Sequence, residues 1–135
     1  MEVKVNVGDP KTKRTVTLTM SADNAKSLFG KKIGDKIRGE LVEKSGYEFE
    51  ITGGSDNAGF PMRRDVTGTG RRRILVTNST GQRQTKKGMR IRKTVAGNIV
   101  SEFTSQLNVK VLKHGAQPLV EAKKEEKKEE EKAAK

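Results

Sequence analysis

The sequence lacks cysteine and tryptophan, and it contains only one histidine. Without cysteine there are no disulfides, no thiolate metal sites and no thiol catalysis. No spacing supplies His114 with a nucleophile or an orienting partner, so we expect an ordinary surface residue. The stretch "GTGRRR" (68–73) begins like a dinucleotide-binding motif but lacks its third glycine. We therefore expect no enzyme, no metal site, no cofactor and no small-molecule substrate.

Long apolar runs are also missing. The longest run of branched apolar residues is Ile74-Leu75-Val76, which cannot span a membrane, and the polar start "MEVKVNVGDP" does not resemble a secretory signal. Leu, Ile, Val and Phe make up 29 of the 135 residues, so any core must be small. These features predict a cytoplasmic protein with no membrane partner.

Positive charge is abundant and unevenly placed. The chain has a formal net charge of +12, and residues 63–93 carry 11 basic and 1 acidic side chains. Residues 1–62, by contrast, carry 10 basic and 9 acidic side chains. Such a concentration indicates a polyanionic partner, because clustered Lys and Arg side chains are the electrostatic signature of nucleic-acid binding.

Alternating apolar and polar residues predict a mainly β fold. Residues 3–7 and 15–20 indicate one hairpin, with a loop longer than two residues, and 36–42 and 47–52 a second around residues 44–46. Ser21 is expected to cap a short helix over 22–29 that ends at Gly30, and residues 53–61 to form a loop. Further strands are expected near 72–77, near 89–100, either continuous or broken at Gly97, and near 106–112. Together these elements predict a small antiparallel β-barrel of six or seven short strands with one short helix.

The pattern indicates a single domain over residues 1–120, without an obligate homo-oligomer. Residues 121–135 hold six lysines and six glutamates and no large apolar side chain. We expect this low-complexity tail to be a frayed helix or disordered.

The basic segment at residues 59–95 is the candidate binding site. Arginine presents a planar fork of donors that matches phosphate oxygens, and glycine lets the backbone approach a phosphate closely. The cations expected to bind RNA are Arg63, Arg64, Arg71, Arg72, Arg73, Arg83, Lys86, Lys87, Arg90, Arg92 and Lys93. Backbone approach or stacking is assigned to Gly59, Phe60, Gly68, Gly70 and Gly88.

Strand periodicity assigns side chains in part of this segment to one of two faces. Met89, Ile91 and Val95 are expected on one face, and Arg90, Arg92 and Thr94 on the other. The triplet 71–73 would send charge to both faces of a barrel strand, so we interpret it as a loop entering a strand. Phe60 either stacks on a base or, as we favour, packs under its own loop.

Few aromatics are available for base stacking. The chain has one tyrosine and four phenylalanines, and none forms the spaced pair of an RNA-recognition sheet. Binding is therefore expected to depend on phosphates and on the shape of a folded RNA. The alternative is a free-standing DNA-compacting or regulatory protein, which would bind duplex DNA comparably.

A family resemblance is carried by three stretches, "GFPMRR", "GRRRILV" and "RQTKKGMRIRKTVAGNIVSE". They closely resemble the archaeal and eukaryotic ribosomal protein S6e family, and the similarity extends over residues 1 to about 115. The resemblance implies a small β-barrel in the small ribosomal subunit that contacts rRNA and neighbouring ribosomal proteins. The cations named above match the family's basic stretch. Eukaryotic members continue into a basic helix with a phosphorylated serine cluster, whereas this chain has a charge-neutral tail without serine, so the resemblance implies the short archaeal form.

Overall fold

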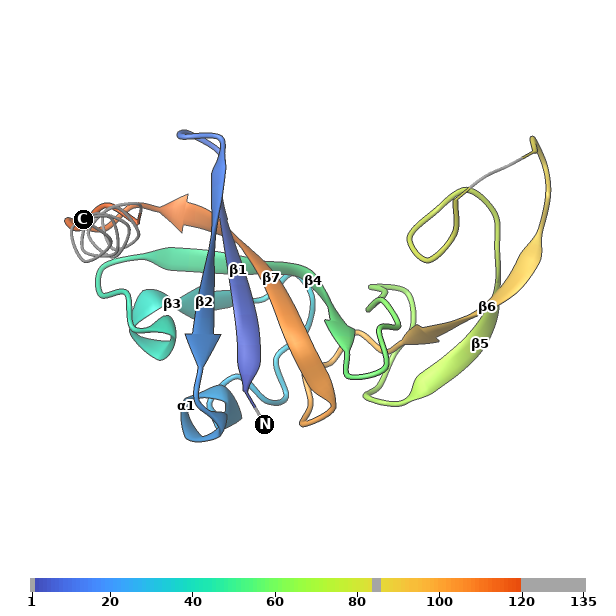
Figure 1. Cartoon of the computed structure of the whole chain (residues 1–135), viewed down its shortest axis with the longest axis horizontal. Coiled ribbons are helices and arrows are strands. Elements are labelled where there is room, and N and C mark those ends of the chain that lie inside the picture. The colour runs from blue at the N-terminus through green and yellow to red at the C-terminus, as the bar shows by residue number, and fades with distance from the viewer. Residues whose placement is uncertain (1, 84–85, 120–135) are drawn as a thin grey trace, which may run out of the picture.

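The computed structural model describes residues 2–83 and 86–119. The fold is mainly β, with seven strands and little helix, as the sequence predicts (Figure 1). The predicted tail, residues 121–135, lies outside the described residues. In chain order the elements are β1 (Val3–Asp9), β2 (Arg14–Met20), α1 (Ala22–Lys26), β3 (Lys36–Arg38), a 3-10 helix (Gly39–Val42), β4 (Glu48–Asp56), β5 (Arg71–Val76), β6 (Ile91–Ala96) and β7 (Thr104–Lys113).

Five strands form one sheet in the order β2-β1-β7-β4-β3. The predicted first hairpin is confirmed, with Val3 opposite Met20 and Asp9 opposite Arg14. β1 and β7 run parallel, whereas the other neighbours are antiparallel. β2 and β3 are the two outer strands of this order, so the sheets are not closed into a barrel and the predicted barrel is not confirmed.

The core lies against one face of this sheet. Val3, Val5 and Val7 alternate into it from β1, and Leu107, Val109 and Val111 from β7, all at most 5% exposed. Burying each such side chain contributes about 1.5–3 kcal/mol relative to leaving it in water. Alternation therefore determines which face of each strand is buried.

The alternation predicted for residues 47–52 divides β4 into a buried and an exposed face. Tyr47, just before the strand, is buried with Phe49 and Ile51, and the rings of Tyr47 and Phe49 stack with centroids 5.7 Å apart. Glu48 and Glu50 lie on the other face and pair with Lys113 and Lys110 of β7. β4 extends to Asp56 into the expected loop, because Gly53 and Gly54 continue its pairing with β7 across a register shift.

The predicted strand over 36–42 was wrong in its second half. β3 ends at Arg38 and a 3-10 helix follows, so the connection to β4 is longer than the predicted turn. Gly39 explains the change of direction: its amide donates to the carbonyl of Tyr47 at 2.7 Å, and a Cβ at this position would overlap the carbonyl oxygen of Lys44. Such close backbone approach is possible only for glycine.

The predicted helix over 22–29 is shorter than expected. α1 ends at Lys26, and Ser21 occupies the N-cap position without a side-chain capping hydrogen bond. Ala25 and Leu28 are buried, but Phe29 is 37% exposed, so the apolar residues of this segment face the core only in part. Gly30 has a left-handed conformation, with φ of 84°, but it lies beyond the end of α1, whose C-cap is Ser27.

β5 and β6 form a separate two-stranded sheet. This hairpin and its connecting loop, residues 71–96, are here called the arm, which projects from the five-stranded body (Figure 1). The predicted strand over 89–100 is confirmed only for 91–96. The sheets are joined at 61–63, where the amide of Met62 donates to Gly54 of β4 and the amide of Arg63 to Ala96 of β6.

Candidate nucleic-acid interface

Both faces of the arm reach solvent. Arg71, Arg72 and Arg73 lie inside β5 and all three are exposed. Our interpretation of the triplet as a loop was therefore wrong. It assumed a barrel strand with a closed interior, whereas an isolated two-stranded hairpin has room for charge on either side.

The strand register distributes cations over both faces. Arg73 lies opposite Thr94 and Leu75 opposite Arg92, so Arg73 and Arg92 share a face. Arg72 lies opposite Val95 and Ile74 opposite Lys93, which places Arg72 and Lys93 on the other face. The predicted separation of Ile91 and Val95 from Arg92 and Thr94 is confirmed, but Met89 and Arg90 precede the strand.

The loop between the strands carries the remaining cations. Arg83, Lys86, Lys87 and Arg90 are exposed there. Gly88 in this loop has φ of 77°, a conformation that favours glycine. Basic side chains are therefore exposed along the arm from its base to its tip.

The Arg63 guanidinium donates hydrogen bonds to groups within the protein. Its Nε and NH2 donate to the two carboxylate oxygens of Asp65 at 2.9 and 2.8 Å, and its NH1 donates to Ser79 Oγ and the carbonyl of Thr80. The bond from Arg63 lowers the pKa of Asp65. Arg63 thus fastens the loop after β5 to the junction between the sheets.

Arg71 is also engaged internally. Its Nε donates to Asp56 at 2.5 Å and its NH2 to the side chain of Asn57 at 2.8 Å, while its guanidinium lies 5.2 Å from the ring centre of Phe60. Phe60 is half-buried, and the choice between packing and stacking on a base stays a prediction. A guanidinium over an aromatic face is a favourable cation–π arrangement.

Asp56 organises this loop, although it is not among the predicted site residues. It is 6% exposed and accepts hydrogen bonds from the amides of Ala58 and Phe60 as well as from Arg71. Burial alone would raise the pKa of Asp56, but these three hydrogen bonds outweigh it and the pKa is lowered. An aspartate before Asn57, Ala58 and Gly59 is a turn signal that a sequence search for such loops can detect.

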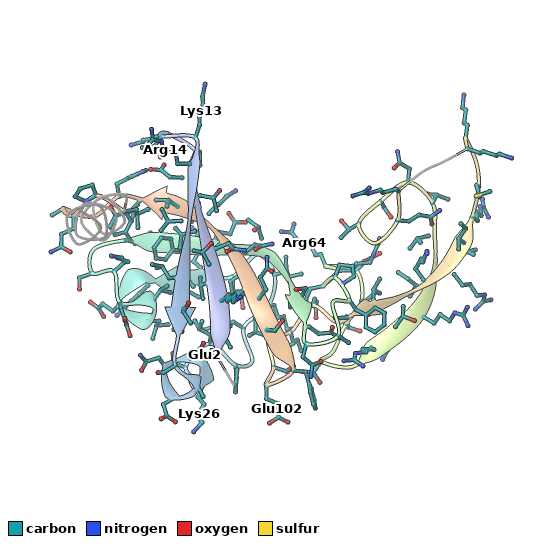
Figure 2. The ribbon with its side chains drawn as sticks, viewed as in Figure 1. Glu2, Lys13, Arg14, Lys26, Arg64 and Glu102 are labelled. Atoms are coloured by element: carbon teal, nitrogen blue, oxygen red, sulfur yellow. The ribbon has the colours of Figure 1, made fainter. Side chains whose placement is uncertain are left out.

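Arg64, next to Arg63 in the chain, has a different environment. It is exposed, and its guanidinium lies close to Gly34, on a cleft of about 640 Å³ between the body and the arm (Figure 2). Thr52, Asn108 and Thr80 line the same cleft. Arg64 is thus available to a ligand that lies where the two sheets meet.

The predicted glycines fall in open parts of this surface. A Cβ at Gly59, Gly68, Gly70 or Gly88 would meet no atom within 4 Å. The Cβ side of these positions is therefore open, although the amides of Gly59 and Gly68 already donate to Asp56 and Asn98 within the protein.

Residues 2–83 and 86–119 give no support for a metal site or for a membrane-spanning helix. No group of three or more His, Asp or Glu side chains there is placed to hold a metal ion. No helix there is long and apolar enough to cross a membrane. His114, expected as an ordinary surface residue, is 28% exposed in its side chain, and its Nε2 lies 2.9 Å from Asp9 Oδ1, joining the ends of β7 and β1.

Comparison with known proteins identifies the family. The family model described as Ribosomal protein S6e matches residues 3–124. The chain belongs to the ribosomal protein S6e family. It is thus a ribosomal structural protein and not an enzyme, as the resemblance implied.

Curated relatives cover almost the whole S6e chain. It is 47% identical over 122 residues to "Small ribosomal subunit protein eS6" of Archaeoglobus fulgidus, which covers 90% of this chain and 95% of the relative. The protein of the same name from Methanosphaera stadtmanae is 46% identical, with 96% and 100% covered. That from Thermoplasma acidophilum is 43% identical, with 87% and 94% covered. All three relatives are archaeal in source, in agreement with the short archaeal form.

Proposed function

We propose that this S6e-family chain is a structural constituent of the small ribosomal subunit and that its arm binds rRNA, mainly through phosphates. The observation that carries the proposal is the row of exposed cations on both faces and the tip of a hairpin that projects from the body. The proposed contacts are Arg64, Arg72, Arg73, Arg83, Lys86, Lys87, Arg90, Arg92 and Lys93.

Arg63 and Arg71 have a different part in this proposal. Their internal hydrogen bonds hold the base of the arm at two points. Arg63 bonds to the loop after β5, and Arg71 bonds to Asp56 at the end of β4. An arm held at its base presents its charges in a defined direction, which reduces the entropy lost on binding. Both arginines thus support RNA binding by positioning the arm.

The mechanism is electrostatic and tolerant of base identity. Each phosphate contact releases counterions, so the logarithm of the affinity falls linearly with the logarithm of the salt concentration, by about 0.7–0.9 per contact. Phosphate contacts fix position and orientation on the RNA but do not read sequence. The shape of the folded rRNA around a projecting hairpin supplies the selectivity.

A charge-matched pair of variants tests the proposal in the full chain. The arm variant replaces four exposed cations by Ala: Arg72, Arg73, Arg92 and Lys93. The control replaces four exposed cations of the body by Ala: Lys4, Lys13, Arg14 and Lys36. Binding to small-subunit rRNA is measured from 50 to 200 mM salt. The arm variant should lose about 2–4 units of salt slope, whereas the control should lose much less. Equal losses, or an unchanged slope in the arm variant, would contradict the proposal.

Sedimentation separates the ribosomal role from the free-standing alternative. In a sucrose gradient of a lysate at moderately high salt, the chain should travel with the small subunit. Recovery of the chain free or on DNA would overturn the assignment to the subunit while leaving the basic arm in place.

A further inference from the structure

A second surface, on the body beside the base of the arm, is apolar. Phe29 and Phe103 are 37% and 53% exposed and line one groove of about 370 Å³, whose walls include Val3, Ala22 and Ala25. The groove lies between α1 and the turn that precedes β7. We call it the Phe groove.

Exposed aromatics are unexpected in this chain. It has only five aromatic residues, and Phe29 and Phe103 are two of them. A single exposed apolar side chain is ordinary, but two phenylalanines around one hollow form the kind of patch that marks an interaction site. Phenylalanine is also enriched at the centres of protein–protein interfaces. The groove therefore has the composition of a protein-docking surface.

The charge around the groove is not that of an RNA-binding surface. Glu102 lines it, and Glu2 is exposed next to the lining residue Val3. The lining cation, Lys26, is paired with Asp23 at 2.8 Å. Figure 2 shows Glu2, Lys26 and Glu102 along the lower edge of the body. Arg71 bonds to the lining residue Asn57 but is itself paired with Asp56. In a chain with a net charge of +12, this surface is therefore locally acidic and would repel phosphate.

We propose that the Phe groove docks a segment of another protein of the small subunit, one that places an apolar side chain between Phe29 and Phe103 and has Lys or Arg on either side of it. The apolar side chain would remove the two phenylalanine rings from water, and the flanking cations would face Glu2 and Glu102. The proposal rests on the function proposed above, since it places the partner in the same subunit.

Photocrosslinking within the subunit tests this assignment. A full chain with a photoreactive phenylalanine analogue in place of Phe103 is expressed, small subunits are purified, and the crosslinked segments are identified by mass spectrometry. The expected product joins position 103 to one protein segment that contains an apolar residue flanked by Lys or Arg. The same analogue at Leu112, 37% exposed near the other end of β7, should not give that product.

Each other outcome overturns the proposal in a distinguishable way. A crosslink to rRNA, to a second copy of this chain or to an acidic segment, or none from a chain that is present in the subunit, removes the Phe groove assignment alone. Absence of the chain from small subunits removes the proposed function as well. Glu102→Lys in the photoreactive chain should lower the crosslink yield at least several-fold, because it repels a basic segment. An unchanged yield would contradict the proposed charge complementarity.

Discussion

Two adjacent arginines show how tertiary contacts divide residues that look alike in the sequence. Arg63 has 15% of its side chain exposed and is bonded to Asp65, Ser79 and Thr80, whereas Arg64 is exposed on the cleft between body and arm. Their sequence context, "GFPMRR", predicted phosphate binding for both. The direction of each side chain decides between holding the arm and facing a ligand.

Replacement of these two arginines by Ala should therefore have different effects. Arg63→Ala should lower the free energy of unfolding by about 1–3 kcal/mol, because it leaves polar partners without their donor. Arg64→Ala should change it by less than about 0.5 kcal/mol but reduce the salt slope of rRNA binding by about 0.7–0.9. Urea unfolding and binding titrations measure both. If Arg63→Ala kept full stability and reduced the salt slope of rRNA binding as much as Arg64→Ala does, Arg63 would be a phosphate ligand instead.

Asp56 predicts a specific dependence of stability on pH. Its pKa is lowered in the folded protein, so its contribution is present above the unfolded value of about 3.9 and is lost as the pH falls through the lower folded value. Asp56→Asn should lower the free energy of unfolding by about 1–3 kcal/mol at pH 7 and weaken the loss of stability between pH 5 and 2.

The matched control for Asp56 is Asp23, which also pairs with a cation but is 87% exposed. Asp23→Asn should change the unfolding free energy by less than about 0.5 kcal/mol. Acid-unfolding curves that are parallel for the parent chain and Asp56→Asn would show that the buried ion pair does not stabilise the fold.

At the scale of elements, regular alternation was a reliable guide and irregular backbone was not. The strands of the sheet were predicted because a half-buried strand requires apolar residues at every second position, as in Val3, Val5 and Val7. The end of β3 and the extension of β4 were missed because they depend on close backbone contacts of glycines: Gly39 with Lys44 in the same connection, and Gly54 with Gln106 far along the chain. A single sequence does not reveal which backbone a glycine will approach.

Gly97 marks the element boundary at which the arm returns to the body. It follows β6, and a Cβ at this position would overlap the carbonyl oxygen of Gly68. Gly97→Ala should therefore lower the free energy of unfolding by about 1–3 kcal/mol, because backbone must shift to make room. Gly70→Ala is the control, since its Cβ would meet no atom within 4 Å and should alter stability by less than about 1 kcal/mol. Thermal unfolding compares the two, and equal effects would refute the steric explanation.

At the scale of the whole molecule, the body and the arm differ in what stabilises them. Most of the buried apolar cluster belongs to the body, and of β6 only Ala96 joins it. Regions with few buried contacts open locally at a lower free energy than that of global unfolding. The amides of β5 and β6 should thus exchange with solvent faster than those of β1 and β7.

Hydrogen exchange followed by mass spectrometry checks this difference. Addition of small-subunit rRNA should slow exchange in the arm and leave β1 and β7 nearly unchanged, because all the proposed contacts except Arg64 lie on the arm. An arm as well protected as the central strands in the free chain, or protection by RNA confined to the body, would contradict the expectation.

The sequence by itself determined the β class, the first hairpin, the buried face of β4, the position of the basic segment and, through its motifs, the S6e family. These features are local, because they depend on side-chain periodicity, composition and short motifs. Only the tertiary structure decided that the sheet is open, that the basic segment forms a projecting arm, and that Arg63 and Arg71 bond within the protein. These outcomes depend on contacts between residues far apart in the chain, such as Arg71 with Asp56 and Gly97 with Gly68, for which the sequence carries no local signal.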